Sequence, residues 1–147
     1  MEITTFDKLN EEDQALVREA MEARKNAYTP YSNHQVGASV RSKSGKIYRG
    51  CNVEIITLQT SVHAERNAVM NMAMNGERVI DAVVCYGPYS GVPCAECRQV
   101  IWEFCDNNPD VRIIGATTEG EIELMTIGEI YPYAYGPSTK GIDCKSF

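Results

Sequence analysis

The sequence predicts a single α/β domain spanning residues 1–147, in which helices cover a mixed sheet of about five strands. The chain alternates segments of helical apolar spacing with short runs of apolar and β-branched residues, and it contains no repeat, low-complexity stretch or long linker. Its 147 residues are the usual size of one domain and are enough to bury a core.

The N-terminal part of the chain predicts a helix followed by a pair of strands. Asn10 is a suitable N-cap for a helix from Glu11 to about Ala27, and Pro30 with its turn-forming neighbours breaks the helical pattern. The segments QVGASVRS and IYRGCNVE predict two strands. The intervening KSGK predicts a hairpin turn, in which Gly45 is free to adopt a positive φ angle.

The middle of the chain predicts a helix over HAERNAVMNMAMNG, with Asn75 and Gly76 as its C-terminal stop. Apolar residues recur at every fourth position of this segment. Two of them, Ala64 and Ala68, are small enough to let the start of the helix lie close to the sheet. The short apolar segment VIDAVVCYG then predicts another strand.

The C-terminal part predicts one more helix and two strands. PCAECRQVIWEFC predicts a helix with Pro93 at or near its first position. DVRIIGATT and EIELMTI predict strands separated by a turn at Glu119-Gly120, and GEIYPYAYG predicts a short turn or helix that Pro132 ends. The predicted order is therefore helix, two strands, helix, strand, helix, two strands and a tail.

Composition and charge exclude several classes of partner. The net charge of -6 and the pI of about 4.9 would repel a phosphate backbone, so we expect a small uncharged or cationic substrate and no nucleic acid. No apolar run approaches the roughly 18 residues that cross a bilayer, which predicts no membrane association. The acidic start MEITTFDKLNEEDQ is unlike a signal peptide and predicts a cytoplasmic protein, in which the six cysteines stay reduced.

A group of three residues has the composition of a metal site. Cys94 and Cys97 form the motif PCAEC, and on a helix residues three apart share one face. CxxC alone fits either a redox dithiol or half of a zinc site. His63, one of only two histidines, is the candidate third ligand, and the 30 residues before Cys94 leave room for a strand between two helices. Both helix starts would then lie at one end of the sheet.

The number of ligands decides between a structural and a catalytic zinc site. A structural site has four protein ligands, whereas a catalytic site keeps the fourth position for water. Four further cysteines could supply a fourth ligand, namely Cys51, Cys85, Cys105 and Cys144. Glu65 favours catalysis, because a hydrolytic site must move protons from water to the substrate and the leaving group. The helix N-termini would also help to keep Cys94 and Cys97 deprotonated.

The order H-x-E followed by P-C-x-x-C is the motif of zinc-dependent nucleobase deaminases. Beyond the motif, the sequence resembles the small homo-oligomeric cytidine deaminases over most of its length. The resemblance lies in YTPYSNHQVGASVRSKSGKIYRGCNVE, HAERNAV, PCAECRQVIWEF and EIYPYAYGP. It implies a three-layer α/β/α sandwich with a five-stranded mixed sheet. It also implies a homo-oligomer, with a tetramer favoured over a dimer, whose active sites borrow residues from neighbouring subunits.

The resemblance also implies roles for individual residues. His63, Cys94 and Cys97 would hold Zn²⁺, and Glu65 would be the catalytic acid and base. Asn52 and Glu54 in NVE match the residues that bind the ribose hydroxyls, and an amide and a carboxylate suit that task. The other matching positions are Ala64, whose backbone helps to hold the base, and Arg66, Arg98 and Gln99, which would support the metal site. Arg66 fits a solvated helix arginine nearly as well.

The sequence departs from the family pattern at several positions. The first ligand is His63, where small tetrameric members often have cysteine. His34 stands where many relatives have a phenylalanine that stacks on the pyrimidine, and it fits a structural histidine equally well. Residues 55–61 lack the usual family residues, and Tyr135 replaces a C-terminal phenylalanine; both are expected to affect substrate binding. Blasticidin S deaminases, a sister group, share the last feature and the missing phenylalanine but lack the complete Asn-Val-Glu.

The sequence therefore predicts hydrolytic deamination of a free cytosine nucleoside, cytidine or deoxycytidine, to the uracil nucleoside and ammonia. Three alternatives are deamination of an antibiotic such as blasticidin S, deamination of a polynucleotide, and a non-catalytic zinc-binding module. The polynucleotide reading conflicts with the negative charge and with the NVE match. Pyrimidine salvage, catabolism and antibiotic resistance all fit the sequence as biological roles.

Overall fold

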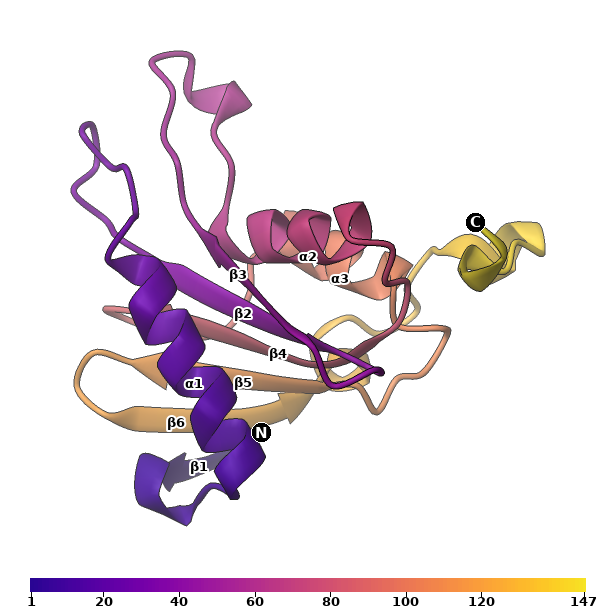
Figure 1. The fold of residues 1–147 in the computed structure, drawn as a ribbon, viewed down its shortest axis with the longest axis horizontal. Coiled ribbons are helices and arrows are strands. Elements are labelled where there is room, and N and C mark those ends of the chain that lie inside the picture. Colours follow the sequence, from indigo (N-terminus) through magenta and orange to yellow (C-terminus); the bar gives the residue numbers. More distant parts are fainter.

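The protein is a three-layer α/β/α sandwich around one six-stranded sheet (Figure 1). The computed structural model describes residues 1–147. The strands lie in the order β1-β6-β5-β4-β2-β3. Only β4 and β5 pair in parallel, and the other neighbours are antiparallel. The strand bounds are β1 Glu2–Thr5, β2 Gly37–Ser42, β3 Ile47–Cys51, β4 Ile80–Gly87, β5 Arg112–Thr117 and β6 Glu121–Thr126.

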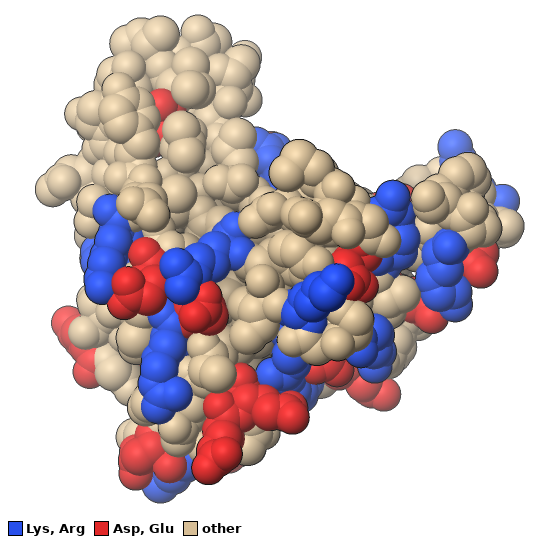
Figure 2. All heavy atoms as spheres, in the orientation of Figure 1, with Lys and Arg blue, Asp and Glu red and all other residues tan.

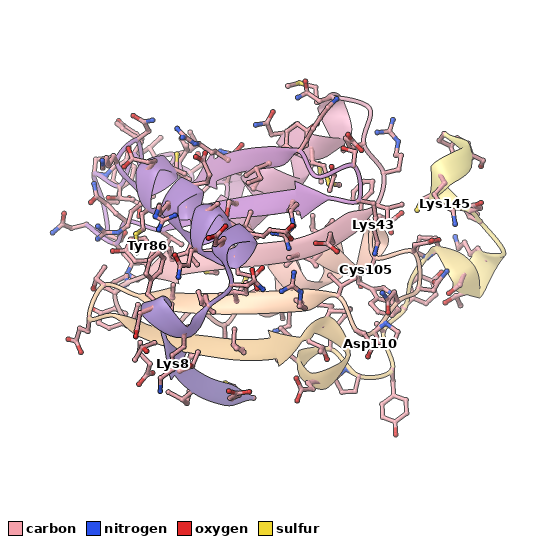
Figure 3. The ribbon with its side chains drawn as sticks, turned by 60° about the horizontal axis from the view of Figure 1, so that its bottom comes forward. Lys8, Lys43, Tyr86, Cys105, Asp110 and Lys145 are labelled. Atoms are coloured by element: carbon pink, nitrogen blue, oxygen red, sulfur yellow. The ribbon has the colours of Figure 1, made fainter.

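Helices cover both faces of this sheet. Helix α1 (Glu11–Arg24) lies across one face (Figure 3), and α2 (Ala64–Met74) and α3 (Ala95–Glu103) cover the other. A short α4 (Ile127–Ile130) follows β6. Strand residues alternate between the faces, so that Ala82 and Val84 pack with the α1 side while Val83 packs under α2 and α3. None of the helices combines the length and the hydropathy that crossing a membrane requires.

The main difference from the sequence prediction is a sixth strand. β1 pairs antiparallel with β6 at the edge of the sheet and precedes the first helix. Its only large apolar residue, Ile3, is 53% exposed, so the segment EITT shows no alternation of buried and exposed residues from which a strand could be predicted. Backbone pairing at an open edge therefore determines this strand more than side-chain burial does.

Local signals explain most of the other boundaries. The side chain of Asn10 accepts a hydrogen bond from the Asp13 amide at 2.8 Å, which confirms the N-cap of α1. Gly45 has φ 88° in the β2–β3 turn, as predicted. Helix α1 ends at Arg24, three residues before the predicted end. β3 ends at Cys51, before the residues Asn-Val-Glu that the prediction included in the strand.

The start of α2 lies directly against β3. A Cβ atom added at Gly50 would be 2.3 Å from both the Ala64 carbonyl oxygen and the Ala68 amide nitrogen. Only a glycine at this point of the strand allows the helix backbone to approach so closely. The expectation that Ala64 and Ala68 bring the helix start close to the sheet is confirmed.

The strand directions place the starts of α2 and α3 together. β3 and β4 are both antiparallel to β2, so they run in the same direction and end at the same edge of the sheet. Each is followed by a connection and then by a helix on the same face. The residues that begin the two helices therefore meet at one end of the sheet, beyond the C-terminal ends of β3 and β4, as the sequence predicted.

Candidate active site

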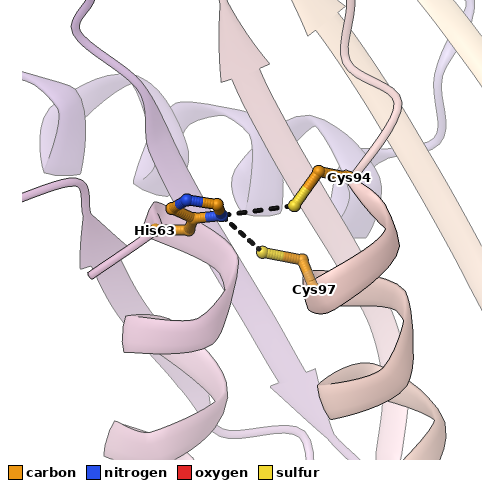
Figure 4. A group of neighbouring side chains, drawn as sticks. All are labelled: His63, Cys94 and Cys97. Carbon is orange, nitrogen blue, oxygen red and sulfur yellow. Dashed lines mark hydrogen bonds between the residues drawn. The ribbon is translucent and has the colours of Figure 1, made fainter. Parts of the chain in front are cut away.

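His63, Cys94 and Cys97 converge at the starts of α2 and α3 (Figure 4). His63 is the N-cap of α2, Cys94 is the N-cap of α3, and Cys97 lies in the first turn of α3. The His63 Nδ1 atom is 3.2 Å from the Cys94 sulfur and 3.5 Å from the Cys97 sulfur. All three potential ligand atoms lie within 4.8 Å of one another.

This spacing fits a tetrahedral zinc ion. Zn–S bonds of about 2.3 Å and Zn–N bonds of about 2.0–2.1 Å put the nitrogen and sulfur of one tetrahedral site about 3.6 Å apart. The observed separations of 3.2 and 3.5 Å are close to this value. No fourth cysteine, histidine or carboxylate joins the cluster. The donor set is thus that of an open site, with three protein ligands and one position for water.

Glu65 lies beside the cluster and is the second residue of α2. It is only 6% exposed, and it lines the same cavity as His63 and Cys94. Its Oε1 atom accepts a hydrogen bond from the Cys85 thiol at 3.3 Å, and its Oε2 atom accepts one from the Cys97 thiol at 3.5 Å. One carboxylate oxygen therefore faces the ligand cluster, where a proton acceptor for an attacking water is needed.

Opposing influences act on the pKa of the Cys97 thiol. Burial, followed by the negative charges of Glu65 and Cys94, raises the pKa of the Cys97 thiol well above its usual range. The backbone N–H of Arg66 acts in the opposite direction and is the weaker influence. The Arg66 N–H, at the N-terminus of α2, thus acts in the predicted direction but does not outweigh burial. A cation bound between the ligands would supply the charge that does.

The cluster opens into a cavity of about 620 Å³, within the usual size range of small-molecule sites. Its walls come from the loop before β2, the segment after β3, the start of α2, the end of β4 and the loop before Cys94. Four of the residues to which the resemblance gave substrate contacts line this cavity, namely His34, Asn52, Glu54 and Ala64.

Asn52 and Glu54 hold the loop that forms one cavity wall. The Asn52 side chain donates to the His34 carbonyl oxygen at 2.7 Å and accepts from the Val36 amide at 2.8 Å. Glu54 accepts from the Tyr31 amide at 2.9 Å and from the hydroxyl of Ser32. The Ser32 hydrogen bond is the main cause that lowers the pKa of the Glu54 carboxyl. Both side chains thus shape the pocket in addition to lining it.

His34 stacks on Tyr89, with ring centroids 5.5 Å apart and ring planes within 10° of parallel. Sequence reasoning missed Tyr89, because an aromatic residue in a connecting loop gives no sign of the residue it will contact. The stack joins the loop before β2 to the loop before Cys94 across the cavity rim. His34 therefore lines the cavity, and its ring is held in place by stacking on Tyr89, which does not itself line the cavity.

Two of the remaining candidate residues, Tyr135 and Gln99, lie outside the cavity. Tyr135 is exposed and is not among the residues that line the cavity. Its carbonyl oxygen accepts a hydrogen bond from the Gln99 side chain at 3.0 Å, and Gln99 also accepts one from the Tyr131 hydroxyl. Gln99 thus attaches the C-terminal segment to α3 and makes no hydrogen bond to a metal-ligand side chain.

The two arginines brace the segments that carry the ligands. Arg98 donates to the Pro93 carbonyl oxygen at 2.7 Å, directly before Cys94, and to the Ile130 carbonyl oxygen at 2.8 Å. Arg66 donates to the Ser61 carbonyl oxygen at 2.6 Å, near the residue that begins α2. Both therefore act on the backbone beside a ligand, and such support fixes the direction of the ligand side chain.

A buried carboxylate on β6 was also missed. Glu123 is 8% exposed and accepts hydrogen bonds from the Gly91 amide at 2.9 Å and the Ser90 hydroxyl at 3.2 Å. It anchors the loop that leads to Cys94. The sequence offered no signal, because a glutamate in an alternating strand is normally assigned to the solvent face.

An α/β/α sandwich with an open three-ligand cluster beside a buried carboxylate has the features of a metal-dependent hydrolase. The family described as the cytidine and deoxycytidylate deaminase zinc-binding region matches residues 10–111. The chain belongs to this cytidine deaminase family, and it is an enzyme of the class that hydrolyses C–N bonds.

Individual relatives agree with this assignment. The cytidine deaminase of Halalkalibacterium halodurans is 37% identical over 124 residues, which cover 83% of this chain and 92% of the relative. The cytidine deaminase of Sporosarcina psychrophila is also 37% identical, with 82% and 88% covered. The crystal structure of cytidine deaminase from Burkholderia pseudomallei superimposes with a TM-score of 0.79 at 31% identity, covering 86% of this chain and 100% of that chain.

Proposed function

We propose that the protein catalyses the zinc-dependent hydrolytic deamination of a free cytosine nucleoside, cytidine or deoxycytidine, to the uracil nucleoside and ammonia. The observation that supports this most directly is the open cluster of His63, Cys94 and Cys97 with the Glu65 carboxylate in the same cavity. The names of the relatives, all cytidine deaminases, point to the same substrate class.

The protein residues would divide the work as follows. His63, Cys94 and Cys97 would hold the zinc ion, which when bound lowers the pKa of a water molecule to about 7 and so supplies a nucleophile at neutral pH. Glu65 takes a proton from the attacking water and delivers it to N3 of the cytosine ring. It then takes the remaining proton of that water oxygen, which by now is bonded to C4, and transfers it to the amino group, so that the C4–N bond breaks, ammonia leaves and the uracil carbonyl remains. Its burial beside the cluster, with Oε2 3.5 Å from the Cys97 sulfur, supports this role.

The charge of the cavity supports a nucleoside over a nucleotide or a polynucleotide. Its lining includes the carboxylates of Glu54 and Glu65 and contains no lysine or arginine. A phosphate group bound there would find no lysine or arginine side chain to pair with, and channels for single-stranded nucleic acid are cationic. Figure 2 shows that the end of the molecule formed by the loops beyond the sheet carries mostly uncharged side chains.

The polar groups at the mouth of the cavity suit a sugar. Asn52 offers an amide, and Glu54 offers carboxylate oxygens that can accept hydrogen bonds from ribose hydroxyls. Ala64 and His34 would contact the base. No observation favours blasticidin S as a substrate over cytidine.

We also propose that the enzyme works as a homo-oligomer, with a tetramer favoured over a dimer. The segment between β3 and α2 projects from the sandwich (Figure 1) and exposes Ile56 by 75% and Leu58 by 63%. Burial of such side chains against a second copy would remove apolar surface from water. In an oligomer Tyr135 could reach the cavity of a neighbouring subunit. Light scattering on the purified protein gives the subunit number.

The cellular setting is part of the same proposal. None of the six cysteines forms a disulfide, which suits the reducing cytoplasm. Deamination of free cytosine nucleosides there would serve pyrimidine salvage. Growth of a cytidine-dependent pyrimidine auxotroph that carries this gene would test the role.

Glu65 variants test the function directly. Ammonia release and the ultraviolet change are followed with cytidine, deoxycytidine, their 5′-monophosphates and blasticidin S, and zinc content is measured on the same samples. We expect turnover of the two nucleosides, and we expect Glu65→Gln to keep its zinc and lose at least about 10³-fold in kcat. Glu103→Gln, at the exposed end of α3, is the control. Near-normal turnover by Glu65→Gln, or no nucleoside turnover by the wild type, would contradict the proposal.

A further inference from the structure

A thiol that is not part of the ligand cluster contacts the Glu65 carboxylate. Cys85 lies on β4 and is 4% exposed, and its sulfur is 3.3 Å from Glu65 Oε1, to which it donates a hydrogen bond. It also lines the cavity. Because Cys85 does not join His63, Cys94 and Cys97, it is no candidate for the fourth ligand. The sequence alone offered Cys85 only as one of four cysteines that could supply a fourth ligand.

The two oxygens of Glu65 have different thiol partners. Oε1 accepts from Cys85, and Oε2 accepts from Cys97 at 3.5 Å. A cysteine that coordinates zinc is a thiolate and has no proton to donate. With the metal in place Cys97 therefore ceases to be a donor, whereas Cys85, outside the cluster, keeps its proton. Cys85 is then the one side chain whose hydrogen bond to Glu65 persists.

The surroundings of Cys85 keep it in the donor form. Burial, and after it the negative charge of Glu65, raises the pKa of the Cys85 thiol well above its usual value. The group is thus a protonated thiol throughout the neutral range. The backbone that carries this thiol is also held in place, because β4 is paired on both sides, with Ala38 of β2 and Gly115 of β5 opposite Cys85.

We propose that Cys85 is a positioning residue for Glu65: its thiol holds one carboxylate oxygen against the central strand, so that the other oxygen faces the metal ligands and the substrate. This inference rests on the proposed proton-transfer role of Glu65. A carboxylate has about four lone-pair sites, so one thiol hydrogen bond leaves the others free for water and for the cytosine ring. A group that is held in the productive rotamer by a rigid strand has less conformational freedom to lose in the transition state.

Three single variants test the inference, all as purified holoenzymes. Cys85→Ala removes the donor, and Cys85→Ser restores a hydroxyl donor at the same place. Cys105→Ala is the matched control, because Cys105 is also buried and its thiol donates only to the Ile101 carbonyl oxygen at 3.1 Å, within α3. Zinc content, free energy of unfolding, kcat and KM for cytidine are measured for each. Cys85→Val, which fills the space without a donor, replaces Cys85→Ala if that variant does not fold.

We expect Cys85→Ala to lower kcat about tenfold, with KM and zinc content close to wild type, which matches the loss of one hydrogen bond to a charged group. Cys85→Ser should recover most of kcat. Cys105→Ala should lose stability and keep kcat. Equal kcat for Cys85→Ala and Cys105→Ala, or no recovery in Cys85→Ser, would overturn the positioning role. An inactive wild type would instead overturn the proposed function, so the two failures are distinguishable.

Discussion

Replacement of Gly50 by alanine tests whether the contact between β3 and α2 positions the metal site. The new Cβ atom would lie 2.3 Å from the Ala64 carbonyl oxygen and from the Ala68 amide nitrogen, whereas ordinary contacts begin at 3.4 Å. Both neighbours are backbone atoms, which cannot swing away as a flexible side chain does. The start of α2 must therefore move from the sheet by about 1 Å to relieve the overlap.

This shift should affect both stability and catalysis. Overpacking of a well-packed core lowers stability by about 1–3 kcal/mol, and two backbone overlaps place Gly50→Ala at about 3 kcal/mol. His63 and Glu65 lie at the displaced end of the helix, on either side of Ala64. A misplacement of about 1 Å at a reacting group can lower the rate about 10²-fold. We therefore expect kcat to fall by about that factor and zinc to bind more weakly.

Urea denaturation measures the free energy of unfolding, and an unchanged m-value shows that both proteins unfold in the same way. Zinc content and kcat are measured on the same protein. Gly87→Ala is the stability control, because a Cβ added there would meet its nearest atom, in Val36, at an ordinary 3.6 Å. A Gly50→Ala protein with stability within about 0.5 kcal/mol of wild type would refute the reasoning, because that is the range of harmless surface substitutions.

Three further changes have defined outcomes. Asp13→Ala should lower the free energy of unfolding by about 2 kcal/mol in urea. It removes a carboxylate that lies 3.3 Å from the buried Arg41 guanidinium, which keeps Asp81 as a partner at 2.8 Å. Ser32→Ala should raise the pKa of Glu54 toward 4.5 in an NMR titration. Since that pKa is depressed in the folded state, the loop contact stabilises at neutral pH and is lost as the pH falls through the depressed value. Glu123→Gln should raise KM for cytidine about fivefold without loss of zinc, because it weakens the hydrogen bonds to the loop before Cys94.

Each of these changes has a control on the same element or in the same measurement. Glu12→Ala, next to Asp13 but 3.9 Å from the Arg41 guanidinium and exposed, should leave stability nearly unchanged. The Glu129 carboxyl, whose pKa is lowered by the Thr126 amide, should titrate identically with and without Ser32. Glu121→Gln, exposed on β6, should leave KM unchanged. A loss in the control equal to that in the test variant would contradict the corresponding interpretation.

The spacing of polar residues made the cluster of His63, Cys94 and Cys97 predictable, while contacts across strands did not follow from that spacing. His63 and Cys94 could be brought together because each begins a helix after a strand of the same direction. The cysteines differed only in their surroundings, so the sequence could not separate Cys85, which contacts Glu65, from Cys105, which follows α3 and contacts the Ile101 carbonyl oxygen of that helix. The sequence pattern placed Asn52 in a strand. Its hydrogen bonds to the loop before β2 could not be predicted, because they depend on the register of β2 and β3.

One row of residues across the sheet connects these observations. The pairing places Gly50, Ala38, Cys85, Gly115 and Glu123 side by side on β3, β2, β4, β5 and β6. Neighbours in register point to the same face, which here is the face covered by α2 and α3. The first four residues of the row are small. The start of α2 can therefore lie close to the sheet at Gly50, and the loop at Gly91 can lie close to it at Gly115. Cys85 in the middle contacts the proposed proton-transfer residue, and the final carboxylate fastens the loop that leads to Cys94. The row therefore supports the segments that carry the site, although only Cys85 of its members lines the cavity. Because these residues are far apart in the chain, only the strand register brings them together.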